Sequence, residues 1–238
     1  MAYKQFVLDE HLSVTIYKRR ASRNLRLTVG ANGEVRVSIP VWTSYRAGVE
    51  FARSRRDWIA RQGRRETPLS DGQAIGKAHR LRLVADASAR RIATRLRQNE
   101  VLVSFPADLS PADPTVQTAA RKAGVRALRQ EAEALLPRRL EQLAEQHGFR
   151  YRSVKIKQLK GRWGSCDNNA DIVLNLFLMQ LPWECIDYVL LHELTHTQVM
   201  RHGPDFWRAM EAVLPDVKQL RKLIRQQQPV LQSAPTVA

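Results

Sequence analysis

Short alternations of hydrophobic and polar residues dominate the beginning of the chain. They predict three strands, at 14–17, 25–29 and 35–39. Asn32-Gly33 is typical of the hairpin turn that would join the last two of these strands. Ser44 is then expected to cap a helix that runs to about residue 65, because apolar residues recur there at helical spacing.

A second group of alternating segments follows a stretch punctuated by glycine, serine and proline. It predicts three more strands, at 78–84, 92–96 and 101–105. The segment Val35–Pro40 resembles Val101–Pro106, since each follows a turn and precedes a helix. Two ordinary hairpins explain this weak similarity as well as a duplication does.

The remainder of the chain shows mainly helical spacing. A long helix is expected from Asp113-Pro114 to His147-Gly148, with Pro137 as a candidate break. Further along, the pattern predicts strands at 154–159 and 171–176, a helix ending near His196, and two short helices at about 204–213 and 216–226.

This order of elements favours the α+β class, with a small sheet packed on the helix that ends near His196. An edge strand of that sheet could line a cleft and pair with an extended peptide. We expect a basic, strand-rich N-terminal region with one helix at 1–110, a catalytic domain at 111–228, and a mobile tail at 229–238.

The most specific chemical signal is the sequence His192-Glu193-Leu194-Thr195-His196, followed by His202. Positions i and i+4 share one face of a helix, so His192 and His196 can bind one metal ion, with His202 as a third ligand. Glu193 is rotated by roughly 100° from His192 and is placed to act on a metal-activated water as general base. Three protein ligands with an open position are typical of catalytic zinc, whereas a structural zinc is closed by a fourth. The alternative is a buried helix with two hydrogen-bonded histidines and an incidental glutamate.

The net charge of +16 favours anionic partners such as nucleotides or nucleic acid. A solvated basic surface explains the charge equally well, and along the chain the aromatic residues do not alternate with the arginines as a stacking platform requires.

No apolar stretch is long enough to span a membrane, and the N-terminus lacks a secretory pattern. The two cysteines form no disulfide framework, so a reducing, cytoplasmic setting is expected.

Several segments together resemble the YgjP-like metal-dependent hydrolases, which are relatives of the SprT-like zinc metallopeptidases. The loop Arg162-Trp163-Gly164-Ser165-Cys166 is similar to the R-W-G-S-C loop of that family. The strand 171–175, the segment 188–196 and the segment 202–207 are similar to the strand, metal helix and third-ligand segment that follow it. The resemblance is strongest from Val154 to Trp207 and is far more specific than H-E-x-x-H alone.

The resemblance implies a zincin-like catalytic core with one zinc ion per chain, but it leaves the substrate open. A metallopeptidase acting on peptides is expected first, because of the motif. A nucleoside triphosphate pyrophosphatase of the UTP type is the second candidate, and a nucleic-acid-binding protein with a structural zinc is the third.

Two further residues are candidates for substrate binding. The guanidinium of Arg162 can hold an oxyanion or a phosphate, or it can make a structural contact instead. The amide of Asn175 can bind substrate backbone, or it can complete the hydrogen bonds at a strand end.

Overall fold

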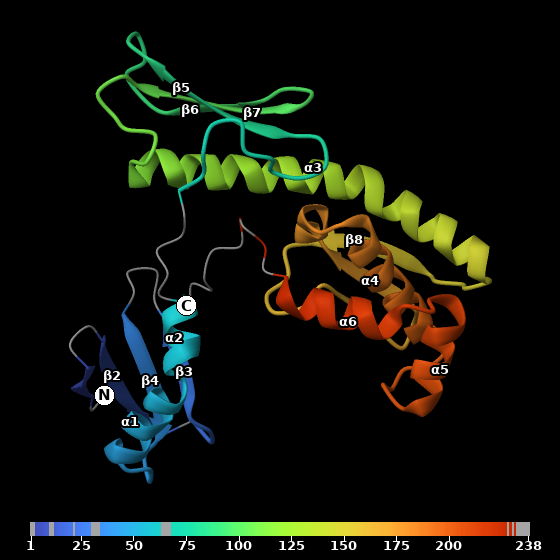
Figure 1. The fold of residues 1–238 in the computed structure, drawn as a ribbon, viewed down its shortest axis with the longest axis horizontal. Coiled ribbons are helices and arrows are strands. Elements are labelled where there is room, and N and C mark those ends of the chain that lie inside the picture. The colour runs from blue at the N-terminus through green and yellow to red at the C-terminus, as the bar shows by residue number, and fades with distance from the viewer. Residues whose placement is uncertain are drawn as a thin grey trace. The chain divides into compact units, whose positions relative to one another are not determined.

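The structure, a computed structural model, describes residues 3–9, 12–20, 22–29, 34–62, 68–227, 229 and 231. The described residues form two compact units, which divide between Gln62 and Pro68 (Figure 1). We call the N-terminal part unit 1 and the part from Pro68 onwards unit 2. The Asn32-Gly33 turn lies outside the described residues.

Unit 1 is a four-stranded sheet with two helices. Its strands are β1 (Tyr3–Asp9), β2 (Leu12–Arg19), β3 (Arg26–Val29) and β4 (Val35–Pro40), in the order β1-β2-β4-β3. The pair β2–β4 is parallel, and the outer pairs are antiparallel. The three strands predicted from the sequence are confirmed with slightly different ends, while β1 was not predicted.

The helix predicted at 44–65 is two helices, α1 (Tyr45–Ser54) and α2 (Arg56–Gln62). Ser44 caps α1 as expected, because its hydroxyl accepts a hydrogen bond from the Ala47 N–H at 3.2 Å. The continuous helix was wrong because the backbone of Arg55 leaves the helical region. Helix α1 packs on β1, β2 and β4 around the buried Ile16 and Ile39.

Unit 2 is built around one long helix, α3 (Pro114–His147). Asp113 caps its first turn, and Gly148 ends it in the left-handed conformation that glycine favours. Pro137 does not break the helix, because the buried Leu136 and Leu140 hold it against the core on either side. Figure 1 shows α3 running between the two sheets of unit 2.

The first sheet of unit 2 contains β5 (Arg80–Asp86), β6 (Ala93–Leu96) and β7 (Glu100–Pro106), in the order β5-β7-β6. One face packs on α3 through the buried Leu81, Val101 and Val103. This sheet therefore shares a core with the helix that was assigned to the catalytic domain. The predicted boundary near residue 110 was wrong for that reason, since the sheet and α3 form a single unit.

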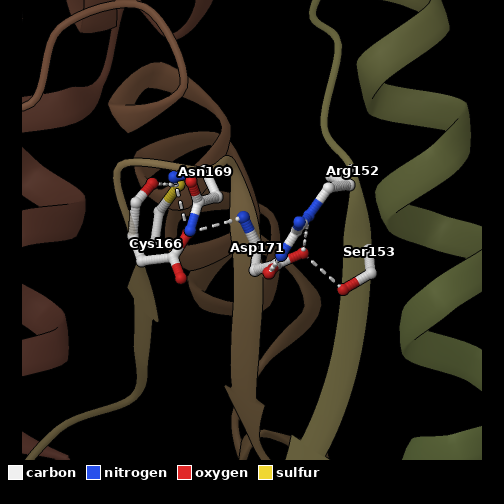
Figure 2. A network of polar contacts seen from close by, with 6 residues as sticks. Arg152, Ser153, Cys166, Asn169 and Asp171 are labelled. Atoms are coloured by element: carbon white, nitrogen blue, oxygen red, sulfur yellow. Dashed lines mark hydrogen bonds and ion pairs between the residues drawn. The ribbon is translucent and has the colours of Figure 1, made fainter.

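The second sheet contains β8 (Ser153–Lys157), β9 (Gly164–Cys166) and β10 (Asp171–Asn175), in the order β8-β10-β9. Figure 2 shows polar contacts at the end of this sheet where β8 and β10 begin. The carboxylate of Asp171 binds Arg152 and the hydroxyl of Ser153, and the Asp167 carboxylate accepts from the Asn169 and Asp171 N–H groups. The Asp171 contacts join β10 to the start of β8, and the Asp167 contacts fix the turn between β9 and β10.

A short 3-10 helix, η1 (Leu176–Gln180), leads from β10 to three further helices. They are α4 (Trp183–His196), α5 (Pro204–Val213) and α6 (Val217–Gln226), close to the predicted ranges. Helix α4 contacts α3 on one side and β9, α5 and α6 on others. The α+β class and the helix packed on a small sheet are thus confirmed. Among the described residues, no helix combines the length and the apolar character needed to cross a membrane.

Most of the segment 229–238, which was expected to be a mobile tail, lies outside the described residues. Leu231 is described, and its side chain is buried in the core of unit 2. Its N–H donates to the side chain of Gln180. At this position the chain is packed, although the sequence showed no core pattern there.

Candidate metal centre and its surroundings

Helix α4 carries two of the three candidate ligands at its C-terminal end. Its apolar residues Cys185, Ile186, Leu190 and Leu194 are buried, and they fix the orientation of the helix between its neighbours. The spacing of four residues then directs His192 and His196 to the same side. The helix ends at His196, so the chain turns back and delivers His202 just before α5 begins.

The three imidazoles converge on one point. Their Nε2 atoms are 3.2 Å apart for His192 and His196, 3.0 Å for His196 and His202, and 2.9 Å for His202 and His192. The ring of Phe206 lies 4.5 to 4.9 Å from all three rings and supports them from one side. The sequence prediction that these histidines come together is therefore matched by the geometry.

This arrangement fits a metal ion. Three nitrogens bound tetrahedrally at about 2.0–2.1 Å from zinc lie about 3.3 Å from one another, which is close to the observed separations. Burial and the neighbouring His196 and His202 lower the pKa of His192 to about 3, so its ring is neutral and its lone pair is available. Burial lowers the pKa of His196 as well. Nδ1 of His196 faces the carbonyl of Val199 at 3.2 Å, so it donates its proton there and leaves the lone pair of Nε2 free to bind a cation.

Only one such cluster exists within the described part of the chain. Among these residues, no other group of three or more histidines, cysteines or carboxylates is close enough to hold a metal. The cluster has three members, and the part of the chain that the structure describes adds no fourth protein ligand. An open position of this kind is typical of a catalytic rather than a structural zinc site.

Glu193 lies next to the first histidine and is buried. Burial raises the pKa of its carboxyl to about 8, while the positive charge of Arg162 acts in the opposite direction. Its Oε2 atom is buried and has no hydrogen-bond partner among the described residues. A buried carboxylate oxygen without a partner is costly to folding and is well placed to act on a water or a substrate.

The loop that leads into β9 lies close to the carboxylate of Glu193. A Cβ atom at Gly164 would lie 2.7 Å from Oε1 of Glu193 and 2.8 Å from its Cγ, which is too close for any real contact. A side chain at this position would therefore force the Glu193 side chain or the loop to shift. Gly164 belongs to the R-W-G-S-C loop, and no local pattern in the sequence indicates its contact with Glu193.

Arg162 is exposed in the same loop, on the side of Glu193, and its charge is near enough to lower the pKa of that carboxyl. Its backbone carbonyl accepts a hydrogen bond of 2.9 Å from the amide of Asn175. The main chain of Arg162 is thus anchored to the end of β10, while its side chain is exposed.

The amide group of Asn175 is fully engaged by backbone. It donates to the carbonyls of Leu159 and Arg162 and accepts from the N–H groups of Leu159 and Phe177. The side chain is buried and holds the loop that carries Arg162 onto the end of β10. These bonds favour the strand-end role over direct contact with a substrate.

Three residues near the histidines were not singled out by the sequence. The ring of Tyr188 is 5.9 Å from that of His192, and its position one helical turn earlier was a signal that could have identified it. The ring of Trp207 stacks on that of His202 at 6.0 Å. The guanidinium carbon of Arg221 lies 4.2 Å from the centre of the Trp207 ring. No local pattern marks Arg221, because α6 brings it to the site from a distance.

Comparison with known proteins gives a family match and two similar structures. The family described as "YgjP-like, metallopeptidase domain" matches residues 23–227. No curated protein matches the chain. The crystal structure of the metallopeptidase zymogen of Pyrococcus abyssi abylysin is 26% identical, with 40% of this chain and 97% of that chain covered and a TM-score of 0.35. The metallopeptidase zymogen of Methanocaldococcus jannaschii jannalysin is 18% identical, with 38% and 94% covered and a TM-score of 0.35.

Proposed function

Because this chain belongs to the YgjP-like family with its metallopeptidase domain, we propose that it is a zinc-dependent peptidase. In this proposal, His192, His196 and His202 bind the zinc ion, and Glu193 is the general base. The observation that carries the proposal is the convergence of three Nε2 atoms within 3.2 Å of one another, beside a buried carboxylate.

Each residue has a defined task in peptide hydrolysis. Zinc held by imidazoles lowers the pKa of water to about 7 and polarises a carbonyl group. Glu193 takes a proton from the attacking water and passes it to the nitrogen of the leaving amine. Arg162 holds the negative charge that develops on the carbonyl oxygen, since a guanidinium donates to an oxyanion with fixed geometry.

The position of β9 supports binding of an extended peptide. It is an edge strand of the sheet β8-β10-β9, and it packs on α4. A peptide that adds to this edge would run past Gly164 and therefore past the carboxylate of Glu193. Main-chain hydrogen bonds would then align the scissile bond without demanding a particular side chain.

A second candidate, a nucleoside triphosphate pyrophosphatase, is favoured by one observation. Arg162 and Arg221 approach the site from different elements, and their charges act on Glu193 and His192 respectively. Two guanidinium groups could hold a triphosphate. Against this candidate, the described residues contain no carboxylate cluster of the kind that usually binds magnesium with a nucleotide.

A substrate screen with the zinc-loaded protein separates the two activities. An unstructured protein, short peptides and the nucleoside triphosphates are each incubated with the wild type and with Glu193→Gln. We expect peptide hydrolysis that falls by about 10²–10⁴-fold in the variant, because the general base is removed. Hydrolysis of triphosphates alone would select the second candidate, and equal rates in both proteins would exclude Glu193 from either mechanism.

The ligand assignment is tested by metal content. We expect about one zinc per chain in the wild type and a large loss in His192→Ala, His196→Ala or His202→Ala, since two imidazoles bind zinc much more weakly than three. Glu193→Gln should keep its zinc, which makes it the matched control. Unchanged zinc in all three histidine variants would contradict the assignment.

A further inference from the structure

One face of the sheet in unit 1 is not covered by its helices. The side chains of Val14, Ile16 and Ile39 point to the other face, where they are buried against α1. Since successive residues of a strand alternate between faces, the intervening residues of each strand lie on the face away from α1. We call this second face the open face of unit 1.

The strand register brings two tyrosines and an arginine into one row on the open face. Tyr3 pairs with Tyr17, Tyr17 pairs with Ser38, and Ser38 pairs with Arg26. The rings of Tyr3 and Tyr17 are adjacent, with centroids 5.5 Å apart, and Tyr3 is 63% exposed. A pair of aromatic rings is thus presented at the surface of a sheet, where no core packing explains it.

Two more arginines flank this row on the same face. Arg19 follows Tyr17 by two residues on β2, and Arg36 lies in the next row, beside the buried Thr15. Arg36 is paired with Glu34 at the start of β4, while Arg19 and Arg26 have no carboxylate partner among the described residues. Residues 1–67 contain 14 lysines and arginines against six acidic residues, so this short segment holds half of the net charge of +16.

We propose that the open face binds a single-stranded nucleic acid. Unpaired bases stack on the rings of Tyr3 and Tyr17, and the phosphates contact Arg19, Arg26 and Arg36. A single strand uses both features, because every base has a free face that stacks on an aromatic ring and every linkage carries one negative charge. A duplex hides those faces, and an acidic peptide would use the arginines but leave the adjacent rings without a role.

Binding is measured on the full chain by fluorescence anisotropy, with labelled DNA and RNA single strands and a DNA duplex of the same length. We expect the DNA single strand, the RNA single strand or both to bind more tightly than the duplex. The double variant Tyr3→Leu/Tyr17→Leu should weaken single-strand binding by at least about tenfold, because leucine is apolar but cannot stack. Tyr3→Phe/Tyr17→Phe keeps the rings and should stay within about twofold of the wild type.

The contribution of the positive charges to binding is tested with a matched pair of variants. Arg26→Gln on the open face should reduce the slope of log K against log salt by about 0.7 for the one lost phosphate contact. Arg46→Gln makes the same charge change on α1, where Arg46 pairs with the exposed Glu50, and should leave the slope unchanged. Circular dichroism of each variant shows that the fold is kept. Glu193→Gln should bind the oligonucleotides like the wild type, so this proposal does not depend on the catalytic one.

Three outcomes would overturn the proposal. The first is a duplex bound as tightly as the single strands. The second is single-strand binding that survives Tyr3→Leu/Tyr17→Leu, since that would reduce the effect to unspecific attraction between charges. The third is equal competition by polyglutamate or by vesicles of anionic lipid, which would make the face a site for acidic partners in general.

Discussion

Gly164 is the residue on which the position of Glu193 depends most directly. The Cα of Gly164 is so close to the carboxylate that an added methyl group would overlap both Oε1 and Cγ. The overlapping atoms belong to the end of a buried side chain, so the carboxylate must change its position to make room for the added methyl group. The loop sequence therefore controls the position of Glu193, the proposed general base, by excluding a side chain rather than by contributing one.

We expect Gly164→Ala to keep the zinc and lose turnover. The displaced carboxylate no longer lies where the attacking water must be deprotonated, and a misplacement of about 1 Å costs about a hundredfold in rate. Activity and zinc content are measured together. Gly203→Ala is the control, since a Cβ there meets nothing within 4 Å and its φ of −91° suits any residue. A Gly164→Ala enzyme with full activity would contradict the contact.

At the residue scale, the sequence predicted those site residues whose relative positions are set by a single helix. The spacing of His192, Glu193 and His196 follows from helical geometry alone, and the structure brings them to one site together with His202. The role of Asn175 stayed open, because its partners Leu159 and Arg162 are 16 and 13 residues away. Contacts between residues that far apart in the chain produce no periodic pattern in the sequence from which they could be predicted.

The same strand arrangement occurs three times along the chain. The trios are β2-β4-β3, β5-β7-β6 and β8-β10-β9 in spatial order. In each trio, the strand that comes last in the chain lies in the centre. It is parallel to the strand that comes first in the chain and antiparallel to the one that comes second. The similarity between Val35–Pro40 and Val101–Pro106 coincides with this, because both segments are the central strand of their trio. Similar burial demands on a central strand explain similar sequences without a common origin.

Element type was predicted better than the ends or the tertiary contacts. Strand β1 was missed because polar Lys4 and Gln5 interrupt the apolar residues of an edge strand. The break at Arg55 also gave no signal, since that residue is a good helix former. Long periodic segments such as α3 were predicted correctly, because their burial repeats over many turns.

Glu131 on α3 fixes the segment that leads into β5. Its carboxylate accepts hydrogen bonds from the backbone N–H groups of Lys77, Ala78 and His79, and it also contacts Nδ1 of the His79 ring at 2.6 Å. Both side chains are buried. The sequence could not show this cluster, because Glu131 is an ordinary helical residue until the turn at 77–79 reaches it.

We expect Glu131→Ala to lower the free energy of unfolding by at least about 3 kcal/mol, because three backbone N–H groups and the buried His79 ring would lose a charged acceptor. Urea unfolding followed by circular dichroism measures the change. Glu133→Ala removes an exposed carboxylate from the same helix, where it pairs with Arg129, and should cost less than about 0.5 kcal/mol. Equal effects of the two substitutions would show that the cluster adds no stability.

At the scale of the whole molecule, the division of the chain differs from the one that composition suggested. The first 110 residues look alike, since they are basic and rich in strands, yet the structure divides them between Gln62 and Pro68. The cause lies in contacts with α3. The side chain of Gln117 binds both the N–H and the carbonyl of Leu69, and Leu81, Val101 and Val103 form one core with the helix.

Two fragments distinguish these boundaries. One that begins at Pro68 keeps every contact of unit 2 with α3, so we expect it to unfold cooperatively and to bind about one zinc per chain. One that begins at residue 111 exposes the face of α3 formed by the buried Val116, Ala120, Ala123 and Ala127. It should aggregate or melt well below the longer fragment, because that apolar surface has lost the sheet that covers it. Thermal unfolding and zinc content are measured on both, and equal melting temperatures would show that the sheet β5-β7-β6 does not stabilise the metal-binding half.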